Sequence, residues 1–229
     1  MKRIVLLTLA LMLTISMALG VLTACKSDVA VKSEGACEYF ETREVDPKFA
    51  RYVKITVKDY GEIVLLLDEL TAPVTVKNFI KLVNEGFYNG LTFHRVMNNF
   101  MIQGGDPNAD GSGGSSEKIY GEFYENGYPF NDISHIEGVI SMARSGNNMN
   151  SASSQFFICN ANSTFLDDKY AAFGYVICGT SIVDSITENT VEYANSTTGT
   201  IADKSKQAVI ESIVVITEAE ALEFVENSK

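Results

Sequence analysis

Residues 93–106 read FHRVMNNFMIQGGD and carry the strongest indication of both fold and site. Arg95 and Gln103 stand there among aromatic and aliphatic residues, next to a pair of glycines. A second stretch, SQFFIC at residues 154–159, precedes FLDDKYAAFG at residues 165–174. No strong nucleophile, acid–base pair or metal-ligand cluster accompanies these stretches in the sequence. They therefore predict a binding surface for chemistry that forms no covalent bond to the protein.

Two further stretches, GSGGSSEKIYGEF at residues 111–123 and GVISMA at residues 138–143, complete an ordered set. With these blocks, the chain resembles a cyclophilin-type peptidyl-prolyl cis–trans isomerase from about Tyr52 to about Glu218. The resemblance implies a mainly β fold, a closed eight-stranded antiparallel barrel capped by two helices. It also implies an enzyme, a rotamase that acts on proline-containing polypeptides as a monomer, with no cofactor and no metal.

The resemblance implies that Arg95 and Gln103 are the catalytic residues. Arg95 offers several fixed N–H donors and stays charged at any relevant pH. A donor aimed at the proline nitrogen of a twisted peptide bond binds the transition state better than the planar substrate, which is what catalysis requires. Gln103 is expected to position the substrate and Arg95. The implied substrate-binding residues are Phe100, Met101, Gly111, Ala143, Arg144, Gln155, Phe157, Phe165, Leu166 and Tyr170.

Three of these residues depart from the family pattern. Phe165 and Tyr170, at the rim of the implied pocket, stand where many eukaryotic members have tryptophan and histidine. Arg144 stands where the family often has asparagine, but the implied contact is through the backbone. Composition alone would make the apolar residues of the set ordinary core residues. Their place in the motifs assigns them instead to a pocket that takes a proline ring by desolvation.

Residues 1–24 are predicted to be a signal peptide rather than part of the fold. Lys2 and Arg3 precede an uncharged run at residues 4–22, and the segment LTAC, ending at Cys25, resembles a bacterial lipobox. That resemblance implies lipidation of Cys25, with acyl chains such as palmitate. The lipid anchor would hold the protein at the extracytoplasmic side of the cell membrane. A cleaved secretory signal peptide and a retained transmembrane helix stay open as alternatives, because such a run can span a bilayer.

The mature chain is predicted to form one isomerase domain at residues 51–218. A lipidated N-terminus and linker at residues 25–50 precede it, and a short acidic tail or helix at residues 219–229 follows. Alternating apolar residues predict a hairpin of strands at 53–57 and 62–67. The other expected elements are a helix capped by Thr71, with Pro73 in its first turn and Gly86 at its end, short strands between residues 91 and 179, a short helix at 181–186, a polar loop at 188–207 and a last strand at 209–217.

Charge and the rarer residue types narrow the function. The formal net charge of −11 disfavours binding to nucleic acid. The GSGG segment at residues 111–114 lacks the lysine of a phosphate-binding loop and is expected to be a flexible loop near the site. His94 and His135 are expected to be structural, not members of a Ser–His–acid triad. Cys159 and Cys178 lie in apolar runs and are expected to be buried.

Two other functions stay open. A membrane-tethered peptide-binding chaperone module with little turnover would keep the pocket, but it would tolerate the loss of Arg95 and Gln103. A lipoprotein that binds small solutes rests on the lipobox alone, and this chain is short for a two-lobed binder. The intact Arg95 and Gln103 favour the isomerase.

Overall fold

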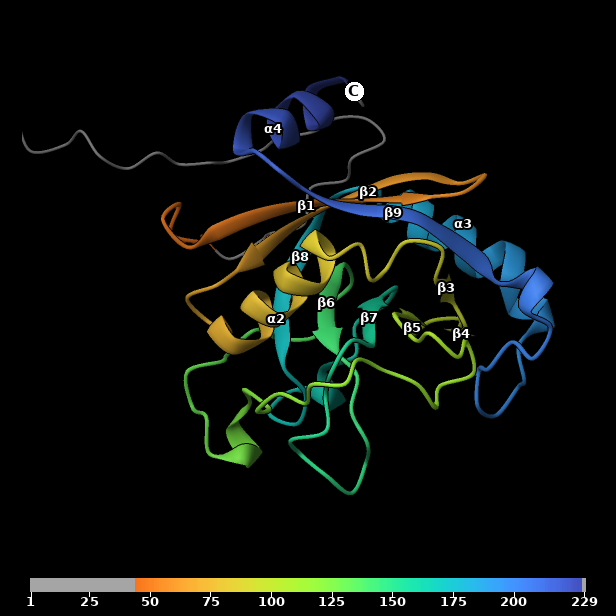
Figure 1. Cartoon of the computed structure of the whole chain (residues 1–229), viewed down its shortest axis with the longest axis horizontal. Helices are drawn as coiled ribbons and strands as arrows, with labels where there is room; N and C mark the ends of the chain where they lie inside the picture. The colour runs from red at the N-terminus through yellow and green to blue at the C-terminus, as the bar shows by residue number, and fades with distance from the viewer. Residues whose placement is uncertain (1–43, 228–229) are drawn as a thin grey trace, which may run out of the picture. The chain divides into compact units, whose positions relative to one another are not determined.

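The computed structural model describes residues 44–227, which belong to one compact unit (Figure 1). The predicted signal peptide, Cys25 and most of the predicted linker lie outside the described residues. The strands are β1 (Ala50–Val57), β2 (Gly61–Asp68), β3 (Thr92–Phe93), β4 (Arg95–Met97), β5 (Met101–Gly104), β6 (Val139–Met142), β7 (Phe156–Cys159), β8 (Ala172–Cys178) and β9 (Ala208–Ile216). The α-helices are α2 (Pro73–Asn84), α3 (Thr180–Thr190) and α4 (Glu218–Asn227).

The strands form one antiparallel sheet in the order β3-β9-β1-β2-β8-β6-β7-β5-β4. The two end strands, β3 and β4, are separated in the chain by His94 alone. The segment 92–97 pairs with β9 through its first half and with β5 through its second half, which nearly closes the sheet into a barrel. The predicted mainly β barrel is confirmed. The described residues hold nine strands rather than eight, because this one extended segment is interrupted at His94.

The hairpin of β1 and β2 follows from its alternating sequence. Ile55 of β1 lies opposite Ile63 of β2, and both side chains are fully buried. Asp59 has a φ of 66° and makes the tight turn between the two strands. Aromatic rings fill the middle of the core, where Phe79 of α2 meets Phe156 of β7 edge-on with 5.5 Å between ring centroids. One side of the hairpin and one side of α2 therefore bury the same core.

Helix α2 is capped by a residue far away in the sequence. Thr71, the predicted cap, donates its hydroxyl to Asp68 instead. The buried carboxylate of Glu122 accepts the backbone N–H groups of Val74 at 2.9 Å and Thr75 at 2.8 Å. This satisfies two free donors of the first turn and places negative charge at the positive end of the helix dipole. The prediction for Thr71 was wrong because the capping group comes from 48 positions further along the chain.

Helices α3 and α4 pack on other parts of the sheet. Helix α3 contacts β2, β4 and β5 and buries Val183 and Ile186. Helix α4 contacts β1 and β8 and buries Ala221 and Val225, so the C-terminal segment, expected to be a short acidic tail or helix, is a helix that packs on the sheet. Within residues 44–227, the helices are too short or too polar to span a membrane.

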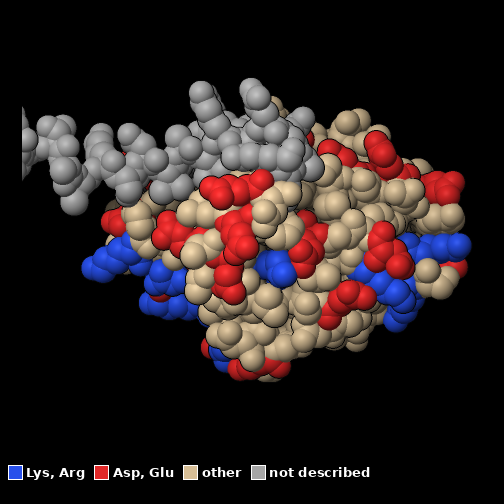
Figure 2. All heavy atoms as spheres, turned by 90° about the horizontal axis from the view of Figure 1, so that it is seen from above, with Lys and Arg blue, Asp and Glu red and all other residues tan. Residues whose placement is uncertain are grey.

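Among the charged side chains on the face seen from above in Figure 2, acidic ones are spread most widely. Asp and Glu side chains spread across it, while Lys and Arg side chains gather mainly towards its two sides. The sequence of helix α4 is itself rich in glutamate.

Candidate active site

Arg95 and Gln103 lie directly opposite each other on β4 and β5. Arg95 Nη1 donates to Gln103 Oε1 at 2.9 Å, and Arg95 Nε donates to the carbonyl oxygen of Thr198 at 2.7 Å. Arg95 Nη2 contacts the sulfur of Met97 at 3.1 Å. Burial lowers the pKa of Arg95 from its ordinary value, but a guanidinium keeps its proton in proteins. The half-buried cation is therefore held in one orientation by contacts on each of its nitrogens.

A row of carboxamides continues from this pair. Gln103 Nε2 donates to Gln155 Oε1 at 2.8 Å. Gln155 Nε2 in turn donates to the carbonyl oxygens of Gly113 at 2.7 Å and Gly111 at 3.1 Å. The amide of each glutamine thus has both its oxygen and its nitrogen engaged. We call Arg95, Gln103 and Gln155 the arginine row.

The loop at the end of the arginine row is tied to a buried carboxylate. Asp106 accepts the backbone N–H groups of Asn108 at 2.8 Å and Gly111 at 2.6 Å. Burial alone would raise the pKa of Asp106, but these amide donors lower it overall, so the group is ionised. Gly111 has a φ of 93°, a conformation that favours glycine. The loop that was expected to be flexible is thus fixed at one end by several hydrogen bonds.

An apolar cluster adjoins the arginine row at the place of the implied pocket. Its buried floor consists of Met101, Phe157, Cys159 and Leu166. Met101 and Gln103 project from the same face of β5, since residues two apart in a strand point the same way, so one strand supplies both the floor and the row. Burial raises the pKa of the Cys159 thiol to about 12, which leaves it unreactive at neutral pH. The partly buried residues around the floor are Met97, Phe100, Ala143 and Tyr170.

The rim of the pocket is aromatic. Phe165 is 62% exposed and touches Phe100 with 5.4 Å between ring centroids. The ring of Tyr170 meets Phe157 edge-on at 6.0 Å. The guanidinium of Arg144 stacks on Tyr170, with 4.6 Å from its central carbon to the ring centroid. The residues predicted from two distant motifs are thus brought together around one pocket, with Phe165 at its outer edge.

One functional contact was not predicted from the sequence. Thr198, in the expected polar loop, supplies the carbonyl that accepts from Arg95. Its neighbour Gly199 accepts the backbone N–H of Val96 at 2.9 Å and has a φ of 76°. A Cβ atom on Gly199 would lie 2.4 Å from the Met97 side chain, so only glycine fits there. The glycine in a threonine-rich loop indicates a turn, but nothing in the sequence places that turn beside Arg95.

A second polar group lies beneath the pocket. His135 Nδ1 lies 2.9 Å from Asp167 Oδ1, and His135 Nε2 lies 3.0 Å from the hydroxyl oxygen of Ser141. Hydrogen bonds from His135 and Ser134 lower the pKa of Asp167, although burial opposes them, so Nδ1 carries the proton and Ser141 donates to Nε2. Ser141 is fully buried, so no substrate reaches its oxygen. We call Ser141, His135 and Asp167 the histidine row; its place in the core fits the expected structural role of His135.

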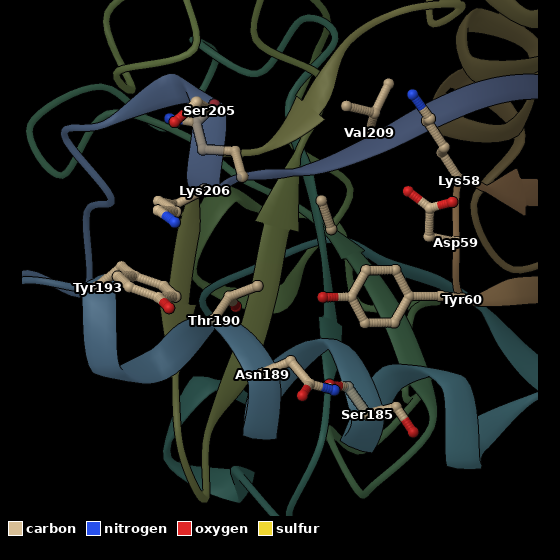
Figure 3. A pocket seen from close by; sticks show the side chains of 12 residues that line it. Lys58, Asp59, Tyr60, Ser185, Asn189, Thr190, Tyr193, Ser205, Lys206 and Val209 are labelled. Carbon is tan, nitrogen blue, oxygen red and sulfur yellow. The ribbon is translucent and has the colours of Figure 1, made fainter.

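Another pocket of the domain does not fit the predicted chemistry. A polar hollow of about 690 Å³ lies between the β1–β2 turn, the end of α3 and the start of β9 (Figure 3). Lys206 lies over the ring of Tyr193 at 4.9 Å, and Asn189 donates to the carbonyl of Ser185 at 2.7 Å, so these groups already have partners. None of the predicted site residues lines it. Within residues 44–227, no group of His, Cys, Asp and Glu could hold a metal ion.

The structure is a nearly closed antiparallel barrel with an arginine–glutamine pair beside an apolar cluster, as the family resemblance implies. The family model described as cyclophilin type peptidyl-prolyl cis-trans isomerase/CLD matches residues 52–215. The chain therefore belongs to this family, and it is a peptidyl-prolyl cis–trans isomerase.

Similar proteins agree with this assignment. The chain is 41% identical over 165 residues to peptidyl-prolyl cis-trans isomerase A of Dickeya dadantii, covering 68% of this chain and 80% of that protein. It is 45% identical over 123 residues to peptidyl-prolyl cis-trans isomerase ppi1 of Schizosaccharomyces pombe, covering 53% and 76%. A cyclophilin type isomerase of Cryptosporidium parvum, solved in the presence of the dipeptide Ala-Pro, superposes with a TM-score of 0.62 and 28% identity over 73% of this chain and 99% of that one.

Proposed function

We propose that this isomerase rotates Xaa-Pro bonds by arginine assistance and that its substrates are exported proteins folding outside the cytoplasm. One observation carries the mechanism: Arg95 donates to Gln103 at 2.9 Å beside an apolar pocket floored by Met101 and Phe157. This arrangement supplies a fixed donor next to apolar side chains of the kind that bind a proline ring.

The chemistry needs only a donor in the right place. Rotation about a peptide bond faces a barrier of about 18–20 kcal/mol, because the planar amide is conjugated. In the twisted transition state the proline nitrogen loses conjugation and gains a lone pair. An N–H of Arg95 aimed at that lone pair is favourable only in the twisted state, so it lowers the barrier. Each ~1.4 kcal/mol of such preference raises the rate tenfold.

The apolar floor binds the substrate, and the arginine row supplies the catalytic donor. The apolar floor takes the pyrrolidine ring out of water. The related isomerase of Cryptosporidium parvum was solved in the presence of Ala-Pro, a ligand that carries such a ring. In the arginine row, Gln103 accepts a hydrogen bond from Arg95, and Gln155 accepts one from Gln103. No proton transfer takes place, so the mechanism needs no titrating group.

A peptide-exchange assay tests this mechanism. Arg95→Ala is expected to lower kcat/KM for a cis-Xaa-Pro peptide by about tenfold to a thousandfold, if the donor supplies on the order of 1.4–4 kcal/mol. Arg51→Ala is the matched control, because Arg51 pairs with Glu69 away from the site and its loss removes the same charge. Unchanged turnover by a folded Arg95→Ala protein would rule the mechanism out.

The proposed place of action rests on the N-terminal sequence. A diacylglycerol on Cys25 would anchor the enzyme firmly, since a single acyl chain holds only marginally and two hold well. A tethered isomerase would act at the membrane, where exported chains begin to fold. Without a catalyst, proline isomerisation in these chains takes tens of seconds or more. Cys25→Ser is expected to shift the protein from the membrane fraction to the soluble fraction or leave it unprocessed. Mass spectrometry that finds unmodified Cys25 within a longer chain would contradict the anchor.

A further inference from the structure

Arg144 is held beside the pocket in a fixed orientation. It follows β6, and its guanidinium carbon lies 4.6 Å from the ring centroid of Tyr170 and 5.2 Å from that of Phe123. Its Nε donates to the carbonyl of Lys169 at 2.9 Å and its Nη1 to the carbonyl of Ser145 at 3.0 Å. A third, longer bond runs from Nη1 to the carbonyl of Gly146 at 3.5 Å. Stacking on two rings and bonding to three backbone carbonyls fixes the plane of the cation before any ligand arrives.

The fixed cation is within reach of a bound peptide. Tyr170 separates Arg144 from Phe157 of the pocket floor, and the rings of Tyr170 and Phe157 are 6.0 Å apart. An extended peptide advances about 3.3 Å per residue. A side chain one to three residues from a proline on Phe157 can therefore meet Arg144.

The cation has no acidic partner in the described part of the protein. Among residues 44–227, no carboxylate lies within 4.0 Å of Arg144, whereas Arg51 and Lys81 are paired with Glu69 and Glu117. The bonds to Lys169 and Ser145 come from Nε and Nη1, and the Nη2 amino group carries two further donors. A carboxylate is the ligand that a guanidinium binds best, because the two planar groups match in geometry and charge.

We propose that Arg144 is a specificity-determining residue that favours substrates with an aspartate or glutamate one to three residues from the proline. This inference rests on the proposed function, since it assumes that the proline ring sits on Phe157. It adds a side-chain role to a position whose implied contact was through the backbone. The pair is half-exposed, so the expected preference for an acidic over a neutral peptide is about twofold to fivefold.

Matched peptides test the proposal. Each pair carries Glu or Gln at one of the three positions on either side of a single proline, and both kcat/KM and the dissociation constant are measured. The wild-type protein should favour the Glu peptide at one or more positions. Arg144→Gln should bring the Glu-to-Gln ratio to about one, Arg144→Lys should keep part of it, and high salt should reduce it in the wild type. Arg51→Gln, which removes the same charge elsewhere, should leave the ratio unchanged.

Two results would overturn the proposal. One is a ratio near one at every position in the wild type. The other is an equal loss for both peptides in Arg144→Gln with the ratio intact, which would mean that Arg144 only supports Tyr170. If no peptide is turned over, the proposed mechanism fails, and the ratio of dissociation constants still decides the role of Arg144.

Discussion

The arginine row and the histidine row meet at the same aromatic ring but differ in exposure. Phe157 lies opposite Gln103 in the pairing of β5 with β7, and opposite Ser141 in the pairing of β6 with β7. His135 stacks on the same ring, with 6.0 Å between centroids. The arginine row is half-buried at the pocket, whereas Ser141 and His135 are sealed beneath it.

The contrast indicates why accessibility matters more than side-chain type in the proposed mechanism. A serine, a histidine and a carboxylate in hydrogen-bond order resemble a nucleophilic triad, and by type they are the more reactive set. An arginine with two glutamines has no nucleophile at all. Because Ser141 and His135 are fully buried while the arginine row is partly exposed, the mechanism that we propose uses a fixed donor, and the reactive-looking set packs beneath the apolar floor.

The largest expected effect is on stability and comes from the histidine row. His135→Ala removes a buried hydrogen bond to Ser141, a partly buried one to Asp167 and a stacked ring, and leaves the buried Ser141 hydroxyl without this partner. We expect the free energy of unfolding to fall by about 2–4 kcal/mol. Urea denaturation measures this as a shift of the midpoint at constant m-value. His135→Gln, which can keep one hydrogen bond, should lose less free energy of unfolding. If His135→Ala lost less than about 0.5 kcal/mol, the histidine row would not have the structural role that distinguishes it from the arginine row.

The next effect is on catalysis and comes from the arginine row. Gln103→Leu frees Arg95 from its partner, and kcat/KM should fall by about tenfold, or 1.4 kcal/mol. The free energy of unfolding should change by no more than about 0.5 kcal/mol, since the amide is half-exposed. Gln155→Leu, one bond further from Arg95, is the graded control and should cost less activity. A large loss of stability in Gln103→Leu would contradict the comparison.

The smallest effect is the dependence on pH. Burial lowers the pKa of both His94 and His135 below the ordinary value, against the opposing effect of nearby carboxylates. The unfolded chain then binds more protons than the folded one as the pH falls below about 6.5, so stability should decline there. Arg95 does not titrate, so kcat/KM of the folded enzyme should stay flat from about pH 8 to about pH 6. If activity and stability fell in parallel over that range, the arginine row and the histidine row would not have separate roles.

Local patterns in the sequence predicted the elements that depend on neighbours. Alternation in β1 and β2, and the spacing from Pro73 to Gly86, reflect interactions within one hairpin or one helix. The family resemblance implied that Gln103 positions Arg95, and the two residues lie opposite each other on adjacent strands. The family resemblance, not the pattern, was needed to bring Phe157 and Leu166 to the same pocket.

The features that escaped prediction all depend on contacts between distant segments. Glu122 caps a helix that precedes it by 48 positions, and Thr198 reaches Arg95 across 103 positions. No local rule connects such pairs, since they meet only when the barrel closes. The break at His94 is of the same kind, because a strand that serves two sheet edges must change its partner midway.

The segment that closes the barrel also carries Arg95, and this couples catalysis to the order of assembly. Thr92 bonds to Gln207, 115 positions later, and the carbonyl that steadies Arg95 comes from the loop just before β9. During synthesis from the N-terminus, the residues of the pocket floor are made before these partners. The guanidinium gains its full set of contacts only when the distant loop that carries Thr198 has docked beside β4. Recovery of turnover during refolding should therefore lag behind burial of the aromatic core. Activity would then report that the barrel has closed at this segment.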